Sequence, residues 1–96
     1  MEIRPARVAD AQAICDVVNY HAERGRMLHR NLEQVYANLR AFHVADASGE
    51  VVGCVAVDVF WADLAEVRSL AVRPAWQRRG LGGRLLAAAK IGRAHV

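Results

Sequence analysis

One segment restricts the fold of this chain more than any other, because it joins a short apolar stretch, a loop rich in arginine and glycine, and an apolar helix without interruption. The apolar stretch covers residues 70–72, three glycines fall within residues 80–83, and a helical pattern begins near Leu81. Glycines allow positive φ and a close approach of the backbone to a ligand. The first N–H groups of a helix have no partner within it, and its dipole is positive there. The segment therefore predicts a binding site for an anion such as pyrophosphate.

The spacing of these residues excludes two common phosphate-binding loops. A P-loop needs Gly-x-x-x-x-Gly-Lys-Ser/Thr, a dinucleotide-binding loop needs Gly-x-Gly-x-x-Gly, and neither pattern occurs. The pattern present is Gln-x-x-Gly-x-Gly, from Gln77 to Gly82. It resembles the coenzyme A pyrophosphate loop of the GNAT family of N-acetyltransferases, and the preceding residues, from Ser69 to Pro74, resemble that family's fourth strand and its exit. An arginine-rich surface turn that only caps a helix is the alternative.

The resemblance implies acetyl-CoA as the co-substrate. In the family, the backbone of this strand pairs with the pantetheine arm like an additional strand, and one N–H group polarises the thioester carbonyl in the manner of an oxyanion hole. The N–H groups of the loop and of the first helical turn hold the pyrophosphate, and the loop arginines add positive charge. The cofactor-binding residues implied are Leu70, Ala71, Val72, Gln77, Arg78, Arg79, Gly80, Leu81, Gly82, Gly83 and Arg84.

Two stretches, residues 23–30 and 65–72, are similar to N-acetylglutamate synthase and related short amino-acid acetyltransferases. The implied reaction transfers the acetyl group to the α-amine of L-glutamate, by direct attack in a ternary complex, at the start of arginine biosynthesis. A substrate with two carboxylates favours arginine side chains, which bind carboxylates in a bidentate way. Arg30 matches the subgroup's carboxylate-binding arginine, with Leu28 beside it, and Arg68 is a further candidate. A solvated loop between two helices is the alternative for Arg30.

Glu66 is the candidate general base, because it lies on the strand that leads to the cofactor and can accept a proton from the amine through a water. The alternative is a structural ion pair with Arg68, two residues further on and on the same face of the strand. No residue of the chain is a convincing acid for the leaving thiolate. Two other functions stay open: acetylation of another amine, such as a protein N-terminus or a small molecule, and binding of acyl-CoA without catalysis.

Composition restricts the class of protein further. A chain of 96 residues allows one domain, and 54% hydrophobic with 24% charged residues is ordinary for a soluble globular protein. No apolar run approaches the roughly 20 residues of a membrane span, and the N-terminus has no apolar secretory segment. The net charge of +3 suits a polyanionic cofactor, but no basic stripe with interleaved aromatic residues occurs. We therefore expect neither a nucleic acid nor a membrane as a partner.

The cysteines and histidines show no metal-ligand spacing. Cys15 and Cys54 are the two thiols, and they form no Cys-x-x-Cys motif. We expect both to be reduced core residues of a cytoplasmic protein that holds no metal.

Read in order, the chain predicts the element sequence β-α-α-β-β-β-α. Asp10 suits the first turn of a helix, Gly25 suits its end, and Asn31 suits the N-cap of a second helix. Residues 46–50 suit a hairpin turn, and Gly53 suggests a bulge or a close approach within a strand. The expected strands are residues 3–5, 42–47, 51–61 and 64–72, and the expected helices are residues 8–24, 32–40 and a third from about residue 81.

This order is that of the first half of a GNAT domain. We therefore expect an α/β protein with a truncated GNAT acyl-CoA N-acyltransferase fold and a mostly antiparallel sheet, in which residues 1–89 form the N-terminal portion of the domain and strand 64–72 is an edge. Residues 91–96 match the translation of a common sequencing adapter, so residues 90–96 are interpreted as a non-native tail; a cationic helix end is the alternative. Members of the family often dimerise, so a homodimer of the full-length protein is expected, with no interface identified.

Overall fold

The helices and strands follow the predicted β-α-α-β-β-β-α order. The computed structural model describes the backbone of residues 1–61 and 64–94 and the side chains of residues 1–58 and 66–90. Short 3-10 turns precede α1, follow α2 and precede α3. The strands are β1 (Glu2–Pro5), β2 (Phe42–Ala47), β3 (Glu50–Trp61) and β4 (Leu64–Val72), and the helices are α1 (Ala11–Ala22), α2 (Leu32–Ala37) and α3 (Leu81–Ala94).

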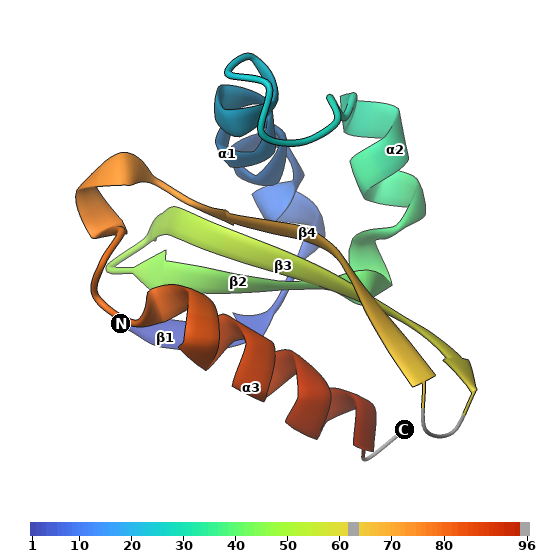
Figure 1. Ribbon diagram of the computed structural model, residues 1–96. Helices are drawn as coiled ribbons and strands as arrows, with labels where there is room; N and C mark the ends of the chain where they lie inside the picture. The colour runs from blue at the N-terminus through green and yellow to red at the C-terminus, as the bar shows by residue number, and fades with distance from the viewer. Residues whose placement is uncertain (62–63, 95–96) are drawn as a thin grey trace.

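The four strands form one antiparallel sheet in the order β1-β2-β3-β4. Helices α1 and α2 lie on one face of the sheet, and α3 lies on the other (Figure 1). Among the described residues no strand pairs with the outer side of β4, so β4 is an edge strand, as predicted. The fold class predicted from the sequence is confirmed.

Both faces of the sheet are covered, which explains why β2 and β3 are more continuously apolar than a strand with one solvated face. On one face, α1 buries Ile14 and Val18 in a core shared with α2. On the other face, α3 buries Leu81, Leu85 and Ala89, which lie one turn apart along the helix. Strand β3 contributes to both cores and is the central element of the fold.

Three helix boundaries differ from the prediction: the start of the first helix, its end at Ala22 instead of residue 24, and the end of the second helix. The first helix begins with a 3-10 turn instead of a regular α-turn, because the Asp10 carboxylate accepts a hydrogen bond from the Arg7 backbone N–H (2.7 Å) and holds this turn tight. The second helix is shorter than predicted, because Asn38 leaves the helical conformation (φ −114°) and its side-chain amide donates to the Gln34 carbonyl (2.9 Å).

The predicted caps and the hairpin turn are confirmed. Gly25 has φ +72° after the end of α1. The Asn31 side chain accepts a hydrogen bond from the Gln34 N–H (2.8 Å) and so caps α2. Ser48 (φ +54°) and Gly49 (φ +93°) both have positive φ, as a two-residue type I′ hairpin requires.

Gly53 lies where β3 is approached closely by α3 and β4. A Cβ at this position would lie 3.2 Å from Leu85 Cδ1 and 3.3 Å from the Ala71 carbonyl oxygen, which is closer than side chains normally approach. The register between β2 and β3 also shifts beside it, so that Val52 is an extra residue without a partner on β2. Both features predicted for Gly53, the bulge and the close approach, are therefore confirmed.

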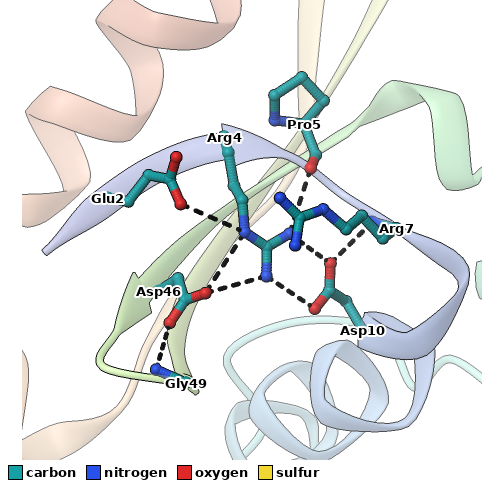
Figure 2. A network of polar contacts seen from close by, with 7 residues as sticks. All are labelled: Glu2, Arg4, Pro5, Arg7, Asp10, Asp46 and Gly49. Atoms are coloured by element: carbon teal, nitrogen blue, oxygen red, sulfur yellow. Dashed lines mark hydrogen bonds and ion pairs between the residues drawn. The ribbon is translucent and has the colours of Figure 1, made fainter.

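A buried ionic network joins β1 to the start of α1 and to the β2–β3 turn (Figure 2). The Arg4 guanidinium, in a residue only 8% exposed, donates to both carboxylate oxygens of Asp10 (2.7 and 3.0 Å) and to Oδ2 of Asp46 (3.3 and 3.1 Å). Arg4 holds the pKa of Asp10 below its ordinary value. The Gly49 N–H, together with Arg4, lowers the pKa of Asp46. One arginine thus holds together β1, the start of α1 and the distant end of β2.

Candidate active site

The loop between β4 and α3 is fastened to the neighbouring strand by Arg73. Its N–H and its Nε donate to two successive carbonyl oxygens of β3, at 2.8 and 3.1 Å. Pro74 then begins a 3-10 turn, a position that suits its fixed φ and its missing N–H. The Arg79 guanidinium lies over the ring of Trp76, 5.0 Å from its centroid. These contacts fix the path of the chain from the end of β4 to the start of α3.

The backbone turns sharply just before α3. Arg78 has φ +62° and Gly80 has φ +74°. The left-handed conformation costs a non-glycine residue about 1–3 kcal/mol, and it is typical of concave backbone sites that bind anions. The Arg84 N–H donates to the Gly80 carbonyl (3.2 Å), which is the first bond of the helix. The three N–H groups before Arg84 therefore have no acceptor within α3.

Neither the backbone conformation nor the packing of the chain requires a glycine at positions 82 and 83. Neither glycine has a positive φ. A Cβ at Gly83 would meet nothing within 4 Å, and a Cβ at Gly82 would only touch Leu70 Cδ2, at an ordinary 3.8 Å. The space above this helical turn is open, and three exposed cations lie on the same segment: Arg78, Arg79 and Arg84. The segment therefore fits a pyrophosphate that must approach the backbone closely.

The end of β4 presents backbone groups to the open edge of the sheet. The Arg73 N–H points to β3, and backbone groups alternate in direction along a strand. The N–H and C=O groups of Val72 and Leu70 therefore point away from β3. This is the edge along which the sequence predicts an extended ligand.

The Val72 carbonyl is already bonded to two side chains. It accepts from His21 Nε2 (2.8 Å) and from Gln77 Nε2 (3.1 Å). Arg26 donates to Nδ1 of the same histidine (3.1 Å), so the imidazole proton is on Nε2. Gln77, predicted to bind the cofactor, thus supports the strand end in this structure, and His21 on α1 is a neighbour of the site that the sequence did not identify.

A pocket of about 270 Å³ lies between the α1–α2 loop and β4. A smaller pocket of about 50 Å³ shares Arg30 and Arg68 with it and is lined in addition by Asp58 and residues around the start of β2. The four residues predicted for acceptor binding and catalysis are all in the larger pocket. Its lining consists of Met27, Leu28, Arg30, Glu66, Val67, Arg68 and Ser69.

A bulge in β4 decides which face of the sheet Glu66 occupies. The register between β3 and β4 shifts so that Arg68 is an extra residue without a partner on β3. Side chains alternate between the faces of a strand, and one extra residue reverses this alternation beyond it. Glu66 consequently pairs with Asp58 and shares the α1–α2 face with Ser69, instead of facing α3.

The ion pair of Arg68 differs from the one considered in the sequence. Its Nη1 lies 2.8 Å from Asp58 Oδ2, and this bond raises the pKa of Arg68. The structural pair between Glu66 and Arg68 is not among the ion pairs of the described residues, because Asp58 on β3 takes that place. Glu66 is exposed and lines the larger pocket. Among the described residues, it has no ion-pair partner.

Two residues that sequence reasoning missed hold Arg30. Asn19 on α1 bonds to both the N–H (2.8 Å) and the carbonyl (2.7 Å) of Arg30. Ser69 is 1% exposed, and its Oγ lies 3.5 Å from Arg30 Nη2. No carboxylate of the described residues lies within ion-pair distance of Arg30, so its charge is available to a ligand. No local sequence signal identified Asn19 or Ser69, because both contacts join distant segments.

A strand edge that ends at a glycine-rich helix start, with a pocket beside it, is compatible with a coenzyme A-dependent acyltransferase. The chain belongs to the GNAT family of acetyltransferases, since the family model described as "Acetyltransferase (GNAT) domain" matches residues 38–96. It is 42% identical over 80 residues to an uncharacterized N-acetyltransferase of Chlorobaculum tepidum, covering 83% of this chain and 52% of that protein. It is 41% identical over 83 residues to an amino-acid acetyltransferase of Mycobacterium tuberculosis, covering 83% of this chain and 47% of that protein.

Solved structures show the same fold. N-acetylglutamate synthase from Neisseria gonorrhoeae, complexed with coenzyme A and N-acetyl-glutamate, superposes with a TM-score of 0.88 at 35% identity, covering 98% of this chain and 22% of that chain. A Mycobacterium tuberculosis protein in complex with CoA gives a TM-score of 0.86 at 35% identity, covering 97% of this chain and 58% of that chain. The chain thus spans about half the length of the two curated relatives named above.

Two further observations concern residues 1–61 and 64–94. No helix in this part of the chain has the length and apolar character needed to cross a bilayer. The same residues contain no group of three or more His, Cys, Asp or Glu side chains that could hold a metal ion.

Proposed function

We propose that the protein containing this chain transfers the acetyl group of acetyl-CoA to the α-amine of an amino acid, and that the acceptor is L-glutamate. The observation that carries the proposal is one pocket beside the β4 edge that contains both Arg30 and Glu66. An amino-acid acceptor needs a cation for a carboxylate and a base for the ammonium proton in the same place. The relatives named as amino-acid acetyltransferase and N-acetylglutamate synthase support this choice.

Each group of the pocket has a role in this proposal. Arg30 binds a carboxylate of the acceptor, while Leu28 and Arg68 line the same pocket and contact the rest of the acceptor. Glu66 takes the proton of the ammonium group through a water, so that a neutral amine attacks. The Leu70 N–H, which faces the open edge, donates to the thioester carbonyl oxygen as charge develops on it. As the amine nitrogen bonds to the acetyl carbon, the thioester C–S bond breaks, and coenzyme A leaves as a thiol with the second proton of the amine. The Arg78–Gly83 segment and Arg84 hold the pyrophosphate of the coenzyme.

The test measures thiol release from acetyl-CoA by the protein encoded at the source locus. The reactions contain L-glutamate, a polyamine, a peptide with a free N-terminus, or no acceptor. Release that depends on glutamate supports the proposal. Release only with the polyamine or the peptide overturns the acceptor assignment, and binding of acetyl-CoA without release in any reaction overturns catalysis.

An arginine variant tests the acceptor pocket directly. A hydrogen bond to a charged group contributes about 1.5–3 kcal/mol, so Arg30→Ala is expected to raise the KM for glutamate by about 10- to 150-fold and to leave the KM for acetyl-CoA unchanged. Arg40→Ala removes an exposed arginine outside the pocket and is the matched control. A raised KM for acetyl-CoA with an unchanged KM for glutamate would count against the assignment.

We further propose that residues 1–89 are the N-terminal portion of a longer GNAT domain and that residues 90–96 are not native. The chain's partial coverage of its relatives supports a longer domain. The adapter-like sequence of residues 91–96 supports a non-native tail, whereas the match to the family model extends through residue 96. The last two of these residues lie outside the described part of the structure. Sequencing the source locus past the Lys90 codon tests it. A frame that continues with other residues supports the proposal, and a genomic stop after Val96 overturns it.

A further inference from the structure

Asn19 connects α1 directly to the residue that carries the cation of the acceptor pocket. Its Oδ1 accepts from the Arg30 N–H at 2.8 Å, and its Nδ2 donates to the Arg30 carbonyl at 2.7 Å. A side-chain amide that bonds to both backbone groups of one residue fixes the position and the orientation of that residue together. The Asn19 side chain is itself half-buried on a helix, so it is a firm point of attachment.

The rest of the α1–α2 loop is held weakly. Leu28 is 85% exposed, His29 is exposed, and Met27 is only partly buried. At the start of the loop, Arg26 donates from its backbone N–H to the His21 carbonyl (3.1 Å) and from its side chain to the His21 ring (3.1 Å), and Met27 packs against the core. From Met27 to Arg30, the hydrogen bonds among the described residues are the two to Asn19 and the long 3.5 Å contact of the Arg30 side chain with Ser69. A segment with few buried apolar contacts opens readily. The placement of Arg30 in the pocket therefore depends on the amide of Asn19.

We propose that Asn19 is a positioning residue for the acceptor: it holds the backbone of Arg30 so that the guanidinium stays in the pocket with Glu66. The inference rests on the proposed function, because it assigns this cation to an acceptor carboxylate. Without the Asn19 amide, the backbone of Arg30 must be ordered when the acceptor binds. Ordering the backbone of one residue weakens binding by about 5- to 30-fold.

A purely structural role for Asn19 makes a different prediction. Loss of a general support for α1 would lower thermal stability and would affect both substrates, because α1 also carries His21, which bonds to the Val72 carbonyl on the coenzyme side. A positioning role affects the acceptor alone. The two roles are thus separated by the ratio of the two KM values and by the melting temperature.

The kinetic test uses Asn19→Ala, with Gln12→Ala as the matched control. Gln12 lies on the same helix and is exposed, and among the described residues its side chain bonds to Asp16 one turn away (3.0 Å). Asn19→Ala is expected to raise the acceptor KM by about 5- to 30-fold, with the acetyl-CoA KM and the Tm equal to those of the control. Asn19→Asp retains an oxygen for the Arg30 N–H and is expected to recover part of the loss. In an Arg30→Ala background, Asn19→Ala is expected to have no further effect.

Amide hydrogen exchange tests the two hydrogen bonds between Asn19 and the Arg30 backbone, here called the clamp, in the absence of any acceptor. The Arg30 N–H is expected to exchange slowly in the wild-type protein and in Gln12→Ala, and faster in Asn19→Ala. Unchanged exchange in Asn19→Ala overturns the clamp, and so does an equal rise of both KM values or an additive effect in the Arg30→Ala background. Failure of wild-type protein to use glutamate overturns the proposed function instead, and leaves the exchange result to decide on the clamp.

Discussion

Glu66 lies directly opposite Asp58 on the neighbouring strand, with Arg68 bonded to Asp58. Two carboxylates at facing positions of a sheet repel each other unless a cation lies between them. The bulge that makes Arg68 an extra residue also brings its guanidinium to Asp58, 2.8 Å away. Arg68 thereby compensates the negative charge of Asp58, and Glu66 is the carboxylate of the two that lines the larger pocket.

Glu66→Gln is expected to lower kcat/KM by about 100-fold or more, because the amide cannot accept the ammonium proton. The affinity for acetyl-CoA, measured by calorimetry, is expected to stay unchanged. Glu33→Gln, at an exposed position on α2, serves as the control. An unchanged rate in Glu66→Gln would remove this carboxylate from the mechanism.

Gly83→Ala is expected to weaken coenzyme A binding by at least about tenfold, which corresponds to about 1.4 kcal/mol, because a methyl group would occupy the open space above the first turn of α3. The free energy of unfolding is not expected to fall, since alanine favours a helix by up to about 1 kcal/mol over glycine. Calorimetry with coenzyme A and urea unfolding measure the two effects. Ala87→Gly, at an exposed position further along α3, is the control and should show the opposite pattern: lower stability with unchanged affinity.

Gly53→Ala is expected to lower the free energy of unfolding by about 1–3 kcal/mol, the usual cost of an extra group in a packed core. The new methyl group would press on Leu85 and on the backbone carbonyl of Ala71, and the carbonyl cannot move aside as a side-chain end can. Urea unfolding measures the change. A stability equal to wild type would show that β3 and α3 are less closely packed than the distances indicate.

The Arg4 network is expected to make the protein sensitive to acid. The pKa of Asp10 is lower in the folded state than in the unfolded chain, so this stabilisation is fully present above the unfolded value of about 3.9 and is lost as pH falls through the lower, folded value. Removing one partner of a buried ion pair typically costs about 3–5 kcal/mol, so Asp10→Asn should be strongly destabilised at pH 7. Urea unfolding at pH 7 and near pH 3 should show a smaller pH dependence in Asp10→Asn than in wild type; an equal dependence would contradict this account.

The two cysteines are expected to be unreactive in the folded protein. Burial raises the pKa of Cys54 to about 12 and also raises that of Cys15. The thiolate is the reactive form, so a disulfide reagent at pH 8 should label neither thiol until the chain is unfolded in urea. Rapid labelling of the native protein would show that one of these core positions opens readily.

Much of the fold follows from local sequence signals. The order of the three helices and four strands was predicted from the sequence, and Gly25, Asn31 and the Ser48–Gly49 pair marked boundaries through conformations that few other residues adopt. The boundaries that differed were those set by side chains acting on the backbone, as with Asn38 at the end of α2. Local chemistry of this kind is visible in the sequence only when the residue type strongly prefers one conformation.

The candidate site was predicted less completely, because its arrangement depends on pairing between strands. The sequence named Glu66, Arg30 and Leu28, and the structure brings them to one pocket. It could not show the bulge at Arg68, since a register shift depends on two strands and not on one. For the same reason Asn19 went unnoticed: its amide acts on a residue beyond the end of its own helix.

The two halves of the proposed reaction are assigned to separate parts of the chain. The proposed coenzyme segment follows β4 and opens α3, whereas the proposed acceptor cation comes from the loop between α1 and α2, and the two meet along β4. A change of loop sequence from Met27 to Arg30, which keeps the bond of Arg26 to the His21 ring, can therefore alter the preferred acceptor without disturbing the coenzyme segment. Exchange of this short loop is accordingly a direct route by which evolution, or an engineer, could redirect the same scaffold to a different amine.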